Sequence, residues 1–203
     1  RHRWRENRIE SNGTYGNKIK FAGLNMVGLK RGIVKLVEYQ DDWKAEAEQT
    51  IANLKSLLGN SAADIQHIGS TAVPAIHAKP IIDIAVGVYD LSDILPIIDR
   101  LNQSDYIFRG EDIPGQLLFV KGDFENDTRT HHIHIVKWNG TEWDNYINFR
   151  DYLNAFPEKA KLYDECKQKA AARFPEDRKH YTEAKQQLIN RYLKEAKAWK
   201  AEH

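Results

Sequence analysis

The sequence has few of the features that mark secreted, membrane-bound or disulfide-stabilised proteins. Its 203 residues include one cysteine, Cys166, so no disulfide can form within the chain. No apolar stretch approaches the roughly 20 residues that a membrane-spanning helix requires. The basic residues 1–5 are not followed by the apolar segment of a signal peptide. We therefore expect a cytoplasmic, reduced protein without a membrane-bound part.

Methionine is equally scarce. Met26 is the only one, and residues 1–25 before it show neither helical nor strand periodicity. We interpret residues 1–25 as a leader or an expression-derived tail, with a disordered native arm as the alternative, and residues 26–203 as the folded domain. The tail carries six Arg or Lys against two Asp or Glu, a net charge of +4, so residues 26–203 contribute −3 to the total of +1. This charge distribution does not favour nucleic-acid binding.

Hydrophobic periodicity predicts an α+β fold, a mixed sheet with flanking helices followed by C-terminal helices. The sheet core is expected within residues 26–140 and a helical lobe within residues 141–203. The apolar stripes of the last helices are predicted to pack in the core rather than to contact a cofactor. Strands are expected at residues 33–37, 65–68, 81–88, 117–121 and 131–137, and helices at residues 43–58, 91–101, 142–155, 158–173 and 178–200.

Asp83 is the first candidate functional residue. In the strand predicted over residues 81–88, the even-numbered side chains are all branched and apolar and face one way. Asp83, Ala85 and Gly87 face the other way and form a small, open surface with a single acid. A buried carboxylate must be hydrogen-bonded, paired or bound to a metal. Asp83 is therefore either a ligand-binding acid or an acceptor of hydrogen bonds from the loop at Gly69.

Two histidines repeat this pattern on another predicted strand. His132 and His134 share one face of residues 131–137, whereas His131 shares the other face with isoleucines. Together with Asp83, the pair could form a metal site of two histidines and one carboxylate with open coordination positions. The pair could equally supply a general acid or base and a phosphate donor, or consist of histidines with purely structural partners.

A Gly-Ser loop precedes the acid-bearing strand. Gly69 lets the backbone approach a ligand closely, and the hydroxyls of Ser70 and Thr71 and nearby N–H groups can face an anion. Lys79 adds a compact cation of the kind that binds phosphate as a point charge. These residues predict a phosphate site beside Asp83.

Five short sequence blocks together carry a resemblance to one family. The blocks are residues 67–74 (HIGSTAVP), 79–84 (KPIIDI), 129–134 (RTHHIH) and 149–153 (FRDYL), and Arg178 with Tyr181 and Lys185. Together, and in this order, they resemble the GrpB family, also called UPF0157, an uncharacterised family placed in the nucleotidyltransferase superfamily. The similarity runs from about residue 33 to residue 198.

The resemblance implies a polymerase-beta-like nucleotidyltransferase core with C-terminal helices. In that superfamily a Gly-Ser turn holds nucleotide phosphates, and paired carboxylates on the next strand bind Mg²⁺ for in-line transfer. Gly69 and Ser70 then correspond to the phosphate turn and Asp83 to the first metal ligand. This sequence departs from that pattern at Ala85, where the second carboxylate is expected. GrpB-like domains also occur fused to dephospho-coenzyme A kinase, which suits a binding or folding-helper role.

Further basic residues are candidates for the walls of the pocket. Arg178, Tyr181 and Lys185 share one helix face, where they could bind phosphate or a nucleotide base or could form a solvated face with the tyrosine packed inward. Arg129 adjoins the histidine strand and is predicted to make a bidentate phosphate contact. Arg150 is interpreted as a structural partner of Asp151 or of another acid.

Two functions follow as hypotheses. The first is a divergent enzyme that binds a nucleotide or a phosphorylated small molecule and transfers a nucleotidyl or phosphoryl group. A divalent metal, Mg, Mn or Zn, held by Asp83, His132 and His134, is then expected, and these three residues also become the catalytic candidates. The second is a non-catalytic ligand-binding or accessory domain of the same fold, which the loss at Ala85 favours. The oligomeric state is left open.

Overall fold

The computed structural model describes residues 27–202, and the predicted tail, residues 1–25, lies outside the described residues. Within the described part of the chain, no helix combines the length and the apolar character needed to cross a bilayer. The elements follow in the order β1 (Leu29–Lys30), α1 (Asp42–Leu58), β2 (Ala62–Ile68), β3 (Ile82–Val88), α2 (Ile98–Gln103), β4 (Ile107–Ile113), β5 (Gln116–Lys121), β6 (Thr128–Arg129), β7 (His131–Lys137), α3 (Thr141–Ala155), α4 (Pro157–Arg173) and α5 (Arg178–Ala201).

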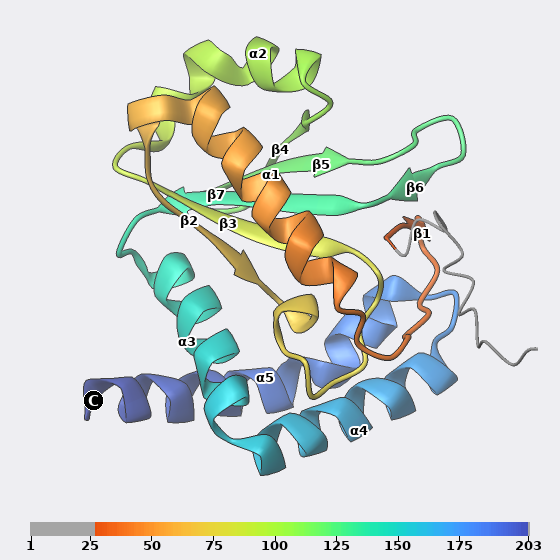
Figure 1. The fold of residues 1–203 in the computed structure, drawn as a ribbon. Helices are drawn as coiled ribbons and strands as arrows, with labels where there is room; N and C mark the ends of the chain where they lie inside the picture. Colours follow the sequence, from red (N-terminus) through yellow and green to blue (C-terminus); the bar gives the residue numbers. More distant parts are fainter. Residues whose placement is uncertain (1–26, 203) are drawn as a thin grey trace, which may run out of the picture.

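A mixed sheet organises the fold. Within residues 27–202 its strand order is β2-β3-β7-β5-β4, with β3 and β7 parallel and the other neighbours antiparallel. Helix α1 lies across one face of the sheet, and α3, α4 and α5 gather on the opposite side (Figure 1). The predicted α+β fold, with a mixed sheet, flanking helices and C-terminal helices, is confirmed.

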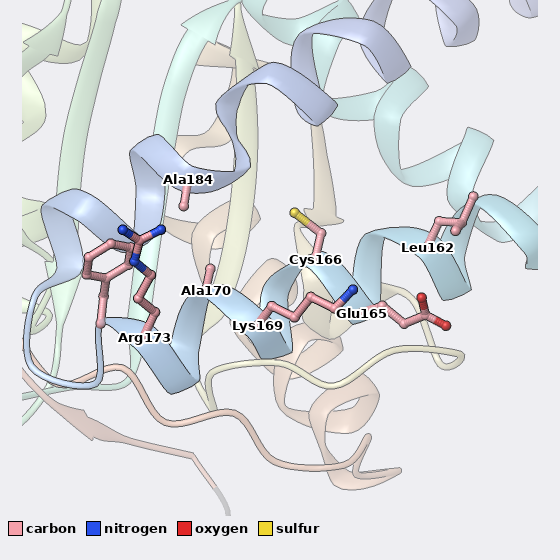
Figure 2. A pocket seen from close by; sticks show the side chains of 8 residues that line it. Leu162, Glu165, Cys166, Lys169, Ala170, Arg173 and Ala184 are labelled. Atoms are coloured by element: carbon pink, nitrogen blue, oxygen red, sulfur yellow. The ribbon is translucent and has the colours of Figure 1, made fainter.

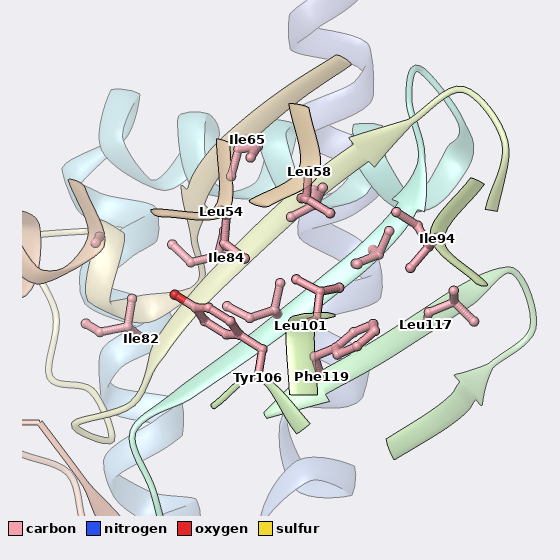
Figure 3. Packing of buried hydrophobic residues seen from close by; sticks show 14 of the residues in the cluster. Leu54, Leu58, Ile65, Ile82, Ile84, Ile94, Leu101, Tyr106, Leu117 and Phe119 are labelled. Carbon is pink, nitrogen blue, oxygen red and sulfur yellow. The ribbon is translucent and has the colours of Figure 1, made fainter. Parts of the chain in front are cut away.

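One face of the sheet packs against α1 and α2 as an apolar core. Ile82, Ile84, Val86 and Val88 of β3 are fully buried there, and Leu54 and Leu58 of α1 cover them (Figure 3). The predicted spacing of apolar residues along α1 produces this contact, because positions three and four apart share one helix face. The helix ends at Gly59, whose positive φ of 52° suits glycine.

The opposite face of β3 is not open, contrary to the prediction. Ala85 is fully buried in a cluster with Trp143 of α3. A side chain at Gly87 would meet Trp138 at 2.8 Å and Trp143 at 3.0 Å. The small residues therefore make room for two indole rings, and only Asp83, at the start of the strand, opens to a cavity.

Two predicted elements differ from the structure. Residues 33–37 form no strand, because Val34 N–H bonds the carbonyl of Pro175 and Val37 makes an isolated bridge to Ala78, so the segment lies against the C-terminal helices. Residues 91–101 form a 3-10 helix, Leu91–Ile97, before the short α2, and Pro96 lies inside that tighter segment. Strand β4 was not predicted.

The three C-terminal helices begin and end close to the predicted residues. Pro157 occupies the first turn of α4, where its missing N–H has no partner to lose. The side chain of Asp177 accepts from the His180 N–H and caps α5. Helix α5 packs against both α3 and α4; it lies alongside α4 and crosses α3 (Figure 1). This packing brings the first turns of α5 to the Asp83 end of the sheet.

Candidate functional site

A charged cavity lies between the Asp83 end of the sheet and the helices α4 and α5. Its volume is about 240 Å³. The structure brings all of the predicted site residues together around it except Arg129. The lining residues are Gly69, Ser70, Thr71, Lys79, Ile81, Asp83, His132, His134, Tyr163, Lys167, Arg178, Tyr181 and Lys185.

The Gly-Ser turn forms one wall because it follows β2 directly and folds back over β3. Gly69 has a φ of 72°, and a Cβ there would lie 2.8 Å from the Asp83 carboxylate. Only glycine therefore fits between the turn and the acid. Thr71 is buried, and its hydroxyl lies 2.9 Å from Nε2 of His67. Burial lowers the pKa of His67 to about 4, so this neutral imidazole serves to hold the turn.

Asp83, His132 and His134 converge as the alternation of their strands predicts. The parallel register places Asp83 opposite His132. Nδ1 of His132 and Nε2 of His134 lie 3.2 Å and 3.3 Å from the same carboxylate oxygen of Asp83. Burial alone would raise the pKa of Asp83, but the hydrogen bonds and charges of the two imidazoles outweigh it and hold that pKa well below its ordinary value. Asp83 is thus a carboxylate at any physiological pH.

These three side chains also suit a metal ion. One potential ligand atom from each lies within 4.8 Å of the others. Two imidazoles and one carboxylate are a donor set for Zn²⁺, Mn²⁺ or Fe²⁺ with open positions. A pair of Mg²⁺ ions needs more carboxylates, and the position that could supply one, Ala85, is buried beneath Trp143. The donor set therefore fits a single transition metal better than a two-magnesium centre.

Two lysines line the same cavity as this acid. Nζ of Lys79 and Nζ of Lys185 lie 5.6 Å and 4.2 Å from the ring centroid of Tyr181. Burial lowers the pKa of each lysine to about 8, and neighbouring cations add to the effect. Arg178 adds to the repulsion on both. The predicted helix face of Arg178, Tyr181 and Lys185 does line the cavity, but Tyr181 is packed inward, 2% exposed, against Val34 and Ala170, as the alternative interpretation expected.

Lys167 on α4 is a cavity residue that the sequence analysis missed. It is 1% exposed, its ammonium donates to Ser70 Oγ at 3.1 Å and to the His77 carbonyl, and Asp164 lies 3.9 Å away. Burial lowers its pKa to about 7. A signal was present: Lys167 is four residues after Tyr163 and three before Ala170, a core position in the apolar stripe of α4.

Arg129 lies outside this cavity. Its guanidinium pairs with Asp127 at 3.2 Å and stacks on Phe124, 4.6 Å from the ring centroid. It lines an adjacent cavity instead, on the other side of the histidines. Arg150 bonds Asp151 at 2.7 Å and the His67 carbonyl at 2.9 Å, so its interpretation as a structural arginine is confirmed.

A larger cavity, about 390 Å³, lies between α4 and α5 (Figure 2). It is lined by Cys166 and by small or apolar residues of both helices, while Glu165, Lys169 and Arg173 extend along its exposed rim. Its lining has neither a histidine nor a Gly-Ser turn. It is therefore a poorer candidate for phosphate or metal chemistry than the charged cavity.

Comparisons with known proteins identify the family. The family model described as GrpB protein matches residues 33–195. The glutamate-rich protein GrpB of Alkalihalophilus pseudofirmus is 40% identical over 151 residues, 73% of this chain and 87% of that protein. The UPF0157 protein YqkA of Bacillus subtilis is 32% identical over 168 residues, 82% of this chain and 48% of its own length.

A solved structure supports the same family assignment. The crystal structure of the conserved protein GrpB from Enterococcus faecalis superposes with a TM-score of 0.74 at 32% identity, over 81% of this chain and 99% of that one. The Cid1 poly(U) polymerase is only loosely similar, with a TM-score of 0.43 at 12% identity over 64% of this chain and 45% of that one, too distant for any inference here. On the family match and these relatives, the chain belongs to the GrpB family.

Proposed function

We propose that this protein binds a nucleotide or another phosphorylated small molecule in the charged cavity. The observation that supports this most is the excess of cations. Lys79, Lys167, Arg178 and Lys185 line the cavity, and Asp83 is the acid that lines it with them. Within residues 27–202, no ion pair involves Lys79, Arg178 or Lys185. Lys167 is buried, Lys79 and Lys185 are half-buried and Arg178 is exposed. Several cations that share a partly buried cavity with one carboxylate destabilise a protein, and an anionic ligand relieves that cost.

Phosphate fits this arrangement better than a carboxylate does. The ammonium groups of three lysines and one guanidinium can neutralise the multiple charges of a di- or triphosphate. Ser70 and the Gly69 backbone offer the turn that can approach its oxygens. The buried ring of Tyr181 contacts the ammonium groups of Lys79 and Lys185 and so helps to position them. These features match what the GrpB resemblance implies for the Gly-Ser turn.

A divalent transition metal at Asp83, His132 and His134 extends the proposal to transfer chemistry. When bound, such a metal polarises a phosphoryl oxygen and neutralises charge on the leaving group. The cavity lysines stabilise the negative charge that develops on the transferred phosphoryl group. Without a metal, the imidazole nitrogens that face Asp83 can instead accept or return a proton at the reacting oxygen; with the metal bound, they are its ligands and take no part in proton transfer. We therefore propose nucleotidyl or phosphoryl transfer as the reaction class.

Calorimetric titration of a nucleotide panel tests binding and metal dependence together. The titrations use Mn²⁺, Zn²⁺ or Mg²⁺, with EDTA as the metal-free condition. We expect the wild type to bind at least one nucleotide, Lys185→Met to weaken that binding at least tenfold, and Asp83→Ala to remove its metal dependence. Lys194→Met, an exposed lysine on the same helix, is the matched control. The proposal fails if no nucleotide binds or if Lys185→Met behaves like Lys194→Met.

A non-catalytic binding domain is the second candidate, and the absence of a carboxylate at Ala85 favours it. A nucleotide should then bind equally well in EDTA, and mass spectrometry should detect no product. Metal-stimulated turnover of the bound nucleotide would exclude this alternative.

A further inference from the structure

A second cavity, lined with arginines, lies beside the first. Its volume is about 210 Å³. Strand β7 lies between β3 and β5, so the ring pair of His132 and His134 separates Asp83 on β3 from Leu118 and Val120 on β5. The residues that line it are Arg31, Arg109, Asp112, Leu118, Val120, Arg129, His132, His134 and Arg178. The candidate metal ligands His132 and His134 therefore face two cavities.

The charge of this second cavity is as one-sided as that of the first. Asp112 is its one acid, and its carboxylate accepts from the Gln116 amide at 2.9 Å. Arg129 is paired with Asp127, whereas no ion pair within residues 27–202 involves Arg31, Arg109 or Arg178. Guanidinium groups in this arrangement favour an oxyanion that can be bound bidentately.

The position of Arg129 strengthens this assignment. It is 7% exposed, and its pairing with Asp127 and stacking on Phe124 hold its guanidinium in place. An arginine fixed in this way loses little side-chain entropy when it binds an anion. Leu118 and Val120 add an apolar surface to the cavity lining, on the same sheet face as the histidines. The cavity thus combines a fixed cation, free cations and an apolar surface.

We propose that this arginine-lined cavity is a second anion site, which receives the phosphate or carboxylate group of a second substrate. This inference rests on the proposed function, because it places the second substrate across His132 and His134 from the nucleotide. Arg178 lines both cavities and would contact both ligands. A transfer enzyme requires such an arrangement, since both reactants must reach the same centre.

Site-resolved arginine labelling tests the second site in the full-length protein. Phenylglyoxal labelling is mapped by mass spectrometry in inorganic phosphate, in succinate, and in sodium chloride at equal ionic strength. At about ten times its Kd an anion occupies about 90% of its site, so we expect about tenfold less labelling of Arg31 and Arg109. Arg173, an exposed arginine at the end of α4, is the matched control and should label equally in all three. Protection by phosphate alone identifies a phosphorylated second substrate, and protection by succinate identifies a carboxylate.

Two variants separate this inference from the proposed function. In Lys79→Met/Lys185→Met, nucleotide binding should be lost while Arg31 and Arg109 remain protected by the anion. In Arg109→Gln, an exposed position, protection of Arg31 should be lost while nucleotide binding is retained. If nucleotides bind but neither anion protects Arg31 and Arg109, only the second site is wrong. If the anions protect but no nucleotide binds, the proposed function fails and the second-substrate role fails with it.

Discussion

The two faces of the parallel strand pair β3 and β7 differ in composition: one is apolar, and the other carries an acid and two histidines. Toward α1, Ile82, Ile84 and Ile133 pack in a continuous apolar core. Toward the C-terminal helices, Asp83 and His132 alternate with those isoleucines and open to a cavity. One strand thus serves stability and chemistry at once, since successive side chains point to opposite faces.

The difference shows where the protein gives up stability. The apolar face is closed and every position on it contributes burial. The opposite face changes along β3. Ala85 and Gly87 pack against the two tryptophans, whereas Asp83 lines a cavity together with lysines. Repulsion among lysines in this partly buried cavity lowers the stability of the fold, and proteins retain such a loss of stability where a functional site requires it.

The largest expected effect comes from breaking the apolar face. Ile84→Ala removes a fully buried side chain at the centre of the core and should lower the free energy of unfolding by about 2–5 kcal/mol. Urea denaturation of the variant measures this loss. Nucleotide affinity at a temperature where the variant is folded should stay within about twofold, because Ile84 faces away from the cavity. A large affinity change with little loss of stability would show that the two faces are not independent.

A matched glycine pair separates backbone strain from damage to the site. Gly69→Ala and Gly115→Ala both place a side chain at positive φ, 72° and 82°, and each should cost about 1–3 kcal/mol of stability. Only Gly69→Ala puts a Cβ within 2.8 Å of the Asp83 carboxylate, whereas a Cβ at Gly115 meets no atom within 4 Å. We expect at least a tenfold loss of Mn²⁺ or Zn²⁺ affinity in Gly69→Ala, measured by calorimetry, and no loss in Gly115→Ala. Equal metal affinity in both variants would contradict the described contact.

Removing a cavity cation should stabilise the ligand-free protein. The folded-state pKa of Lys185, about 8, is below the usual 10.5, so its charged form is disfavoured in the folded protein. The resulting penalty is fully present below pH 8 and disappears as the pH rises from 8 to 10.5. Lys185→Met should therefore gain about 1 kcal/mol at pH 6 and much less at pH 10.

Thermal unfolding of Lys185→Met at both pH values checks this, with Lys194→Met as the control. The same variant should lose nucleotide affinity, so stability and binding would change in opposite directions. A variant that is less stable than Lys194→Met at pH 6 would show that Lys185 has a stabilising partner.

The central part of the site was predictable because it depends on alternation alone. Asp83 on one strand and His132 and His134 on another each lie opposite an apolar set, and any pairing of the two strands with those sets on one face brings the polar residues together. The Gly-Ser turn follows from its place immediately before that strand. Its glycine, its hydroxyls and the nearby Lys79 predicted phosphate binding, and the family resemblance implied the same role.

The remainder depends on tertiary contacts that local pattern does not encode. The largely apolar residues 33–37 have the pattern of a strand, yet their backbone hydrogen-bond partners are Ala78 and Pro175. Strand β4 carries glycine and charged residues and has register shifts, so its pattern is not that of a strand. Lys167 lies at the site because α4 packs against the Gly-Ser turn, where the lysine donates to Ser70. Neither segment's sequence predicts this contact.

The smallest expected effect is a proton taken up when the nucleotide binds. Near pH 8, Lys79 and Lys185 are about half protonated and Lys167, with a pKa of about 7, is mostly neutral. A bound phosphate favours the charged lysines and raises their pKa values, so binding at pH 8 should take up on the order of one proton. At pH 6 the lysines already hold their protons and uptake should vanish.

Calorimetry in two buffers of different ionisation enthalpy measures this proton directly. The pKa of Asp83, the acid that lines the cavity with the lysines, is held well below its ordinary value, so this carboxylate stays charged across this range and adds no proton to the expected signal. Lys185→Met should reduce the uptake at pH 8, and Lys194→Met should leave it unchanged. If instead protons are released on binding, or if uptake is the same at pH 6 and pH 8, the ligand does not sit against these lysines, and the polar face of β3 serves another purpose than the one proposed here.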